Sequence, residues 1–179
     1  MPVRYRIRQF WNAIKAVPAP EEIQKANQAL SSPLMALFLE MQTSEQAHCL
    51  WIFNRLLEQD ETNADLLAAA LLHDVGKSCH PLRLWERVVA VLGKALLPTR
   101  VKSWGAGAPF GWKRAFVVAE QHPVWGAELA QRAGASPITV SLIRHHQANA
   151  GDLPRGRSAP QSRLEQRLLI RLKLLDDES

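Results

Sequence analysis

The sequence predicts a single all-α domain, a helical bundle, and three features of the chain support this. Apolar residues recur at helical spacing almost throughout, and no segment alternates apolar and polar residues as a half-buried strand does. Apolar residues make up 47% of the chain and charged residues 22%, a balance typical of globular proteins. A chain of 179 residues can bury one hydrophobic core but is too short for two ordinary domains.

The N-terminal part is expected to hold helices that precede the main domain. Residues 3–16 form a basic amphipathic stretch, which could lie on a membrane or a nucleic acid but more often packs on its own domain. A second helix begins near Glu21 and breaks at the Ser-Ser-Pro sequence of residues 31–33, and a short apolar segment follows. We therefore expect residues 1–43 to be a helical extension packed on a main domain of residues 44–179.

A long helix is expected at the start of the main domain. Ser44 is a suitable N-cap for a helix that runs from Glu45 to about Gln59. The residues expected on or near its inner face are Ala47, Leu50, Trp51, Phe53, Asn54 and Leu57.

The next helix is predicted over residues 64–75. Thr62 and Asp65 resemble a capping box at its start, and Gly76 is expected to end it in a left-handed conformation. Further on, residues 101–112 contain four glycines and prolines between tryptophans, which predicts a loop that packs on the domain.

The second half of the chain again shows helical spacing from about Lys113. Pro123 has the position of a first-turn proline, in a helix that Gly134 would close. Ser136, followed by a proline, is expected to cap the next helix, which runs to His146. Residues 150–160 then predict a polar loop. The last predicted helix, residues 161–177, carries a leucine face made of Leu164, Leu168, Leu169, Leu172 and Leu175.

Charge and composition limit the classes of partner. The chain has 22 Lys and Arg against 17 Asp and Glu, a net charge of +5, which suits an anionic partner such as a phosphorylated small molecule. No apolar stretch is long enough to span a bilayer and the first residues lack a secretory pattern, so we expect a cytoplasmic protein without a membrane partner. Two cysteines form no disulfide framework, which fits the same compartment. Nucleic acid is not the expected partner, and the oligomeric state stays open.

The histidines are the most informative residues. Five of the six fall, with two aspartates, in the order His48, His73-Asp74, His122, His145-His146 and Asp176, each at or inside a predicted helix. Imidazole and carboxylate groups suit iron, manganese, nickel or zinc, and helical bundles build such sites from inward-facing side chains of several helices. A lone histidine on an apolar helix is more often a hydrogen-bonded core residue, so the inference rests on the whole set.

That order resembles the HD superfamily of metal-dependent phosphohydrolases, from about Ser44 to the C-terminus. Residues 73–77, His-Asp-Val-Gly-Lys, look like the end of the signature helix, and residues 122–126, His-Pro-Val-Trp-Gly, resemble the His-Pro segment of the two-metal members. Residues 143–147 resemble the next ligand motif. Residues 174–179 resemble the closing Ala-Asp helix, with leucine in the alanine place.

The resemblance implies a pair of divalent transition-metal ions. One ion would be held by His48, His73, Asp74 and Asp176, and Asp74 would bridge to a second ion held by His122 and His146. His146 is favoured over His145 because the family helix usually ends Ile-Arg-x-His, and Asp176 is favoured over Asp177 on the same alignment.

The resemblance also implies the chemistry, which is hydrolysis of a phosphate ester or anhydride in a nucleotide-like small molecule by a metal-bound water. Asp74 and Lys77 are the expected catalytic residues, with Lys77 holding a substrate phosphate as a point charge. A plain solvated lysine is an equally good interpretation of that position.

Several alternatives stay open. Cyclic-di-GMP phosphodiesterases of the superfamily carry an acidic residue and a Gly-Tyr-Pro motif after the paired histidines, but Gln147 stands here and residues 151–154 read Gly-Asp-Leu-Pro, which argues against that substrate. Diadenosine tetraphosphate hydrolases share the ligand order. A few relatives bind two irons and activate oxygen, and an HD fold can also serve as a non-catalytic nucleotide sensor.

Other polar and aromatic residues have simpler explanations. Cys49 and Cys79 could touch a metal, but small buried apolar positions explain them better. His80 is expected to be exposed. Among the tryptophans, Trp104 and Trp112 are the better candidates for the wall of a nucleobase pocket, because both lie in the predicted loop.

Overall fold

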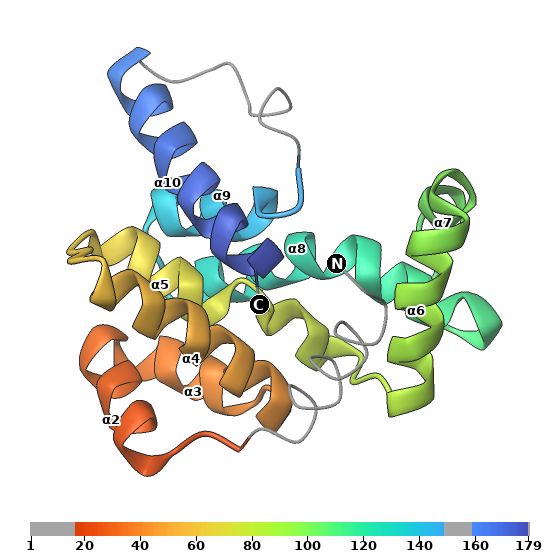
Figure 1. Ribbon diagram of the computed structural model, residues 1–179, viewed down its shortest axis with the longest axis horizontal. Helices are drawn as coiled ribbons and strands as arrows, with labels where there is room; N and C mark the ends of the chain where they lie inside the picture. The colour runs from red at the N-terminus through yellow and green to blue at the C-terminus, as the bar shows by residue number, and fades with distance from the viewer. Residues whose placement is uncertain (1–16, 149–158, 179) are drawn as a thin grey trace.

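The structure is a computed structural model that describes residues 17–148 and 159–178 (Figure 1). All regular elements in these ranges are helical, which confirms the predicted all-α class. The elements are α2 (Pro20–Ala29), α3 (Ser32–Leu39), α4 (Thr43–Glu58), α5 (Ala64–Leu72), the 3-10 helix η1 (Val75–Cys79), α6 (Leu84–Leu96), α7 (Pro98–Trp104), η2 (Gly111–Lys113), α8 (Arg114–Arg132), α9 (Pro137–His145) and α10 (Ala159–Glu178).

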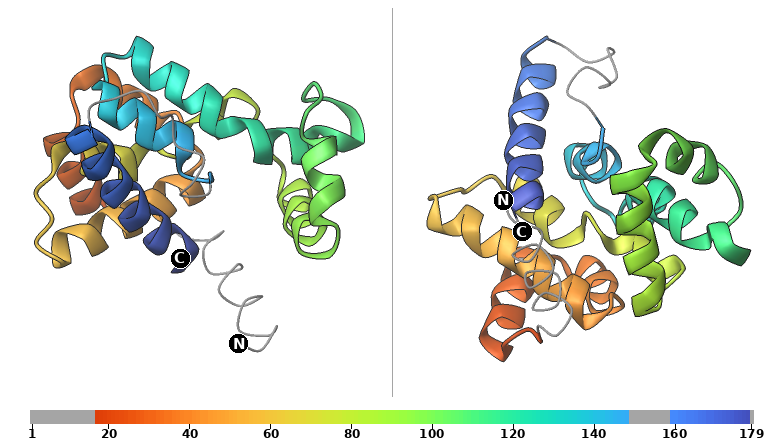
Figure 2. Two further views of the ribbon diagram at one scale, coloured as in Figure 1. Left: turned by 90° about the horizontal axis from the view of Figure 1, so that it is seen from above. Right: turned by 45° about the vertical axis from the view of Figure 1, so that its right-hand side comes forward.

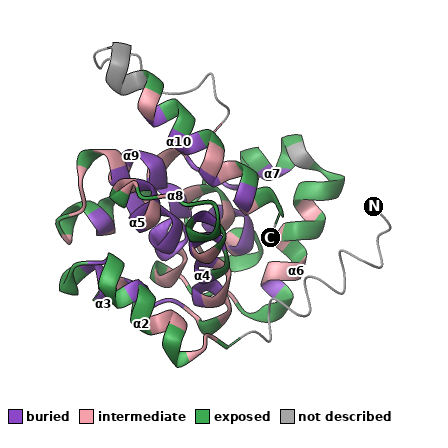
Figure 3. Cartoon of the chain, turned by 60° about the vertical axis from the view of Figure 1, so that its left-hand side comes forward, coloured by how far each residue is buried: buried purple, intermediate pink, exposed green. Residues whose placement is uncertain are grey.

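Helix α5 forms the centre of the core. Its second half, residues 68–72, is buried on all sides because α2, α3, α4, α9 and α10 all pack against it. Figure 3 shows the buried residues gathered where α4, α5, α8 and α9 meet. Helices α2 and α3 contribute Ala26, Leu34 and Phe38 to this same core. The division of the chain at residue 43 stays a prediction, and the helix expected at residues 3–16 lies outside the described residues.

Helix α4 is rotated relative to the expected inner face. Leu50 and Phe53 are buried as expected, but Trp51 and Leu57 are exposed, and Ile52 and Leu56 are buried in the core instead. The helix starts at Thr43, with Gln42 and not Ser44 at the cap position. The buried face continues from Phe53 to Cys49 and Leu56, which lie four residues before it and three residues after it.

The end of α5 differs from the prediction. Asn63, not Thr62, caps its start, with Oδ1 accepting a hydrogen bond from the Leu66 amide at 2.9 Å. The helix stops at Leu72, η1 follows, and Gly76 is not in a left-handed conformation. Glycine is needed at that position for space, because a Cβ would lie 2.0 Å from the His122 carbonyl oxygen of α8.

Helix α8 is longer than expected. It runs without a break through Pro123, so His122 lies inside the helix and not at its start. The proline removes one backbone donor, but buried residues on both sides of it hold the helix in place. Gly134, with φ of +85°, follows the helix end as expected, and the Ser136 hydroxyl caps α9 by accepting from the Thr139 amide at 3.0 Å. Helix α10 also forms where it is predicted.

Residues 84–113 form an arm that projects from one side of the core (Figure 2). The predicted loop at 101–112 is partly helical, because α7 extends to Trp104 and the irregular part is limited to residues 105–110. Helices α6 and α7 pack on each other and on α8. Among the described residues, no helix is both long and apolar enough to cross a membrane.

Candidate metal centre

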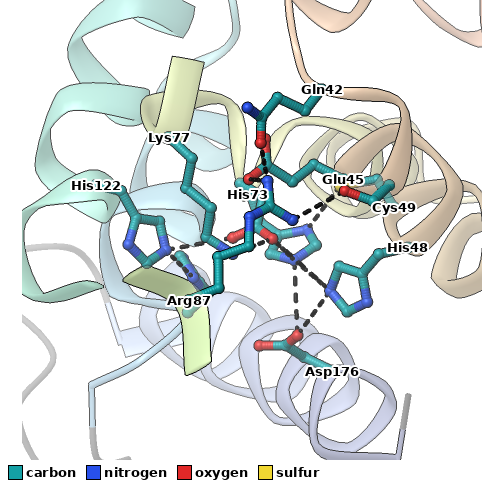
Figure 4. A network of polar contacts seen from close by, with 12 residues as sticks. Gln42, Glu45, His48, Cys49, His73, Lys77, Arg87, His122 and Asp176 are labelled. Atoms are coloured by element: carbon teal, nitrogen blue, oxygen red, sulfur yellow. Dashed lines mark hydrogen bonds and ion pairs between the residues drawn. The ribbon is translucent and has the colours of Figure 1, made fainter. Parts of the chain in front are cut away.

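The six predicted ligand residues meet at one place in the structure (Figure 4). They come from five parts of the chain. His48 lies in α4, His73 and Asp74 at the end of α5, His122 in α8, His146 directly after α9, and Asp176 near the end of α10.

The first group of donors surrounds the His48 ring. His48 Nε2 lies 3.2 Å from His73 Nε2 and 3.9 Å from Asp74 Oδ2. Asp176 approaches the same two rings, with Oδ1 3.0 Å from His48 Nε2 and 3.7 Å from His73 Nε2. Helix α10 holds this carboxylate in place because Leu172 and Leu175, about one turn apart, are buried in the core directly before Asp176.

The second group contains Asp74, His122 and His146. His122 Nε2 lies 3.3 Å from His146 Nε2 and 3.2 Å from Asp74 Oδ1. Asp74 therefore turns one oxygen toward each group, with Oδ2 facing His48 and His73. A carboxylate in this position can be shared by two cations.

Backbone carbonyls fix the orientation of three imidazole rings. The Nδ1 atoms of His73, His122 and His146 lie 3.0, 2.9 and 2.8 Å from the carbonyl oxygens of residues 70, 118 and 143. A carbonyl can only accept, so each Nδ1 donates and, in the neutral ring, each Nε2 lone pair points into the cluster. Metal-binding histidines use this same arrangement.

Three acceptor atoms meet in the second group. His122 Nε2, His146 Nε2 and Asp74 Oδ1 face one another, and the Gln147 side-chain amide lies 3.4 Å from His122 Nε2. Ligand atoms about 2.0–2.2 Å from a shared ion lie roughly 3.0–3.5 Å from each other. The spacing and the chemistry of these donors both fit a transition-metal ion.

The pKa shifts of His122, His146, Asp74 and Asp176 favour the forms that bind a metal, and His73 is the exception. Burial alone would lower the pKa of His73, but Cys49 and Asp74 raise it well above its usual value. Burial lowers the pKa of His122, and burial together with His73 and His122 lowers the pKa of His146 well below its usual value. Burial alone would raise the pKa of Asp74, but Lys77 and His73 hold it well below the ordinary range. For Asp176, burial likewise opposes ionisation, and His48 and His73 still lower the pKa. Neutral imidazoles and charged carboxylates are the ligating forms.

The structure separates the two adjacent histidines. His145 turns away from the cluster, with Nδ1 2.9 Å from the carbonyl oxygen of Ser141 one turn earlier. His146 is buried against His122 and His73. The geometry therefore supports the choice of His146.

Lys77 lies in η1 beside the shared carboxylate. Its Nζ is 2.5 Å from Asp74 Oδ2, and 29% of its side chain is exposed. It is thus neither a plain solvated lysine nor fully enclosed. Its predicted contact with a substrate phosphate stays a prediction.

Arg87 and Glu45 are polar neighbours of the centre that the sequence did not indicate. Arg87, from α6, donates to Glu45 Oε1 at 2.8 Å, to Ser44 Oγ at 2.9 Å and to Gln42, all at the start of α4 (Figure 4). These contacts tie the arm to the helix that carries His48. The spacing of three residues places Glu45 on the same side of α4 as His48, and this could have been read from the sequence. The sequence does not show that Arg87, some forty residues later, is the partner of Glu45.

The remaining candidates lie in other surroundings. Burial raises the pKa of the Cys49 thiol, whose Sγ is 3.7 Å from His73 Nδ1, so it packs as a neutral group. Cys79 is exposed, which differs from its expected burial. His80 is half-buried, and not exposed as expected, because its ring packs edge-on against Trp125. Trp104 and Trp112 on the arm pack against each other and against Phe116 of α8.

Comparison with known proteins gives one match. The family model described as HD domain matches residues 42–177. No curated protein and no solved structure matches the chain. The matched range contains all of the residues that converge at the cluster.

Proposed function

The chain belongs to the HD domain family, and on that premise we propose that it is a metal-dependent phosphohydrolase that cleaves a phosphate ester or anhydride of a nucleotide-like small molecule. The observation that supports this most is the convergence of two donor groups that share Asp74. Two-metal phosphohydrolases need such a pair of adjacent sites.

The proposed ligands fall into two sets around Asp74. His48, His73 and Asp176 would hold one divalent ion, and His122 and His146 would hold the other. When bound, such ions supply an activated water and neutralise charge on phosphoryl oxygens. Iron, manganese, nickel and zinc all accept these nitrogen and oxygen donors.

The chain's own residues would contribute positioning and charge. The carbonyls behind three of the imidazoles keep each Nε2 aimed inward, which removes the need to reorganise the ligands during the reaction. Lys77 is partly exposed next to the shared carboxylate, so its ammonium can meet a phosphate that approaches from solvent. The net charge of +5 favours the approach of an anionic substrate.

The test is a metal-dependent assay of the full chain. The protein is loaded in turn with iron, manganese, nickel and zinc, and phosphate release is measured from a panel of phosphorylated nucleotides and other metabolites. His146→Ala is expected to lower kcat/KM by at least about 100-fold, because it removes a proposed ligand. His145→Ala is the matched control and should change it little, since that ring faces Ser141.

Two results would contradict the proposal. Metal binding without phosphate release from any substrate would favour a nucleotide sensor or, with iron and consumption of oxygen, an oxygenase. Equal losses in the two histidine variants would show that the assignment of the second ligand set is wrong.

A further inference from the structure

The outer face of α6 is apolar and exposed. Trp85, Val89, Leu92 and Leu96 are spaced by four, three and four residues, so they lie along one side of the helix. Their exposed fractions reach 59% at Trp85 and 73% at Leu96. The flank of α6 beside this stripe packs so closely on α8 that a Cβ on Gly93 would lie 2.4 Å from the Phe116 ring. The apolar stripe is therefore turned away from the core that would otherwise bury it.

Aromatic side chains extend the exposed apolar surface at the same end of the molecule. Phe110 and Trp112 are 75% and 64% exposed. Trp112 contacts Phe116, the residue that also packs against α6. Monomeric proteins rarely leave large apolar patches in water unless a partner covers them.

Apart from Glu86, the charged residues of the arm are all cations. Between Glu86 and Glu120 the sequence contains no acidic residue. The cations in that interval are Arg87, Lys94, Arg100, Lys102, Lys113 and Arg114. Arg87 and Arg114 pair with Glu45 and Glu86. Lys94, Arg100, Lys102 and Lys113 are exposed, so the arm carries exposed cations as well as exposed apolar side chains.

We propose that the arm docks on the surface of an anionic lipid bilayer. Such a surface offers negative headgroups for the cations and an apolar layer for the stripe, and tryptophan side chains are favoured at that boundary. The docking would be peripheral, since no described helix can span a membrane. This inference departs from the sequence prediction of no membrane partner, which rested on the lack of a spanning segment.

The charge and the apolar residues also argue against two other partners for the arm, a second copy of the chain and a nucleic acid. A second copy of the chain would place the same cations against each other across the interface, which disfavours a symmetric dimer through this face. A nucleic acid would satisfy the cations but would leave the aliphatic residues of α6 in water. An anionic bilayer accommodates both features.

The test is co-sedimentation of the full chain with vesicles of phosphatidylcholine alone and of phosphatidylcholine mixed with phosphatidylglycerol. We expect binding to the anionic vesicles, little binding to the neutral ones, and weaker binding as salt is raised. Lys94→Ala with Lys102→Ala should lower the partition coefficient by about fivefold for each cation removed. Leu92→Ser with Leu96→Ser should lower it by more than about tenfold.

A matched control removes the same number of exposed apolar residues elsewhere. Leu39→Ser with Ile170→Ser changes side chains on α3 and α10 that are 53% and 46% exposed, and binding should not change. Circular dichroism confirms that each variant is folded.

Three outcomes would overturn the proposal. In the first, the unchanged chain does not bind anionic vesicles. In the second, the α6 variant binds as well as the unchanged chain, so the lipid contact lies elsewhere, for example in the basic residues 3–16. In the third, the chain does not bind vesicles but its mass rises with concentration and the α6 variant stays monomeric, so the face is an interface between copies.

Discussion

The metal centre and the arm depart from ordinary burial in opposite directions. At the centre, polar groups such as His73, His122 and His146 are buried almost completely, whereas on the arm Trp85 and Leu96 are left in water. Both arrangements cost stability when nothing compensates for them. Departures of this kind occur at functional sites, where side chains contact a ligand or another surface and not only the rest of the fold. The partners we propose are a metal ion inside the core and an anionic membrane surface outside it.

The largest effect is expected at the carboxylate shared by both donor groups. Asp74→Ala should lower the rate of hydrolysis by several orders of magnitude, more than His146→Ala does, because it removes a ligand from both proposed ions. Steady-state kinetics with the best substrate measures this difference. A near-normal rate in the Asp74 variant would show that the centre is not the site of reaction.

The C-terminal ligand should have a smaller effect. Asp176→Ala should weaken metal binding by about 10- to 100-fold, because Asp176 approaches only one donor group. Asp177→Ala is the control, since that neighbour is exposed. Metal titration of both variants gives the comparison, and equal affinities would remove Asp176 from the ligand set.

Substitution of one glycine near the centre and one on the arm compares how closely the backbone is packed in the two regions. Gly76→Ala should lower the free energy of unfolding by about 3 kcal/mol or more, because its Cβ would meet backbone atoms of His122 and Gly126. Gly107→Ala should change it by less than about 0.5 kcal/mol, since the nearest atom would lie 3.9 Å away. Urea unfolding of the metal-free proteins measures both changes. Similar values for the two variants would contradict the close approach of η1 and α8.

The smallest effect concerns the ion pair at the base of the arm. Glu86 accepts from Arg114 at 2.7 Å, and although burial opposes ionisation, Arg114 and the Arg83 backbone amide lower the pKa of Glu86. A lowered pKa stabilises the fold above the usual value of 4.5, and this stabilisation is lost as pH falls through the lowered pKa. Glu86→Gln should therefore cost about 1–2 kcal/mol at neutral pH, and the cost should shrink below that usual value.

The control for that measurement is Glu128→Gln on the exposed side of α8. Denaturant unfolding at a series of pH values compares the two variants. A cost for Glu86→Gln that stays constant down to acid pH would show that the ion pair does not contribute through its charge.

The features that the sequence predicted correctly depend on residues close together in the chain or on the residue types that a metal requires. Gly134 and Ser136 mark the boundary between α8 and α9 because a positive φ and a hydroxyl cap are local requirements. The order of histidines indicated the cluster because metal ligands must be of few residue types. Gly76 was misinterpreted because its role is the approach of another helix, and Pro123 because packing holds α8 together through it.

The exposure of α6 could not be predicted for a related reason. Helical spacing in its sequence indicates an apolar face, but a pattern does not show which elements cover that face. Arg87 illustrates the same limit, since its acceptors lie at the start of α4. Contacts between segments far apart in the chain come only from the folded arrangement.

The metal content of the purified chain tests the central claim most directly. The full chain is expressed without added metal, purified, incubated with iron, manganese, nickel or zinc, freed of excess ion and examined by elemental analysis. The proposed centre predicts about two ions per chain, and fewer in Asp74→Ala, because that carboxylate would serve both positions. No bound ion under any of these conditions would contradict the account of the buried cluster.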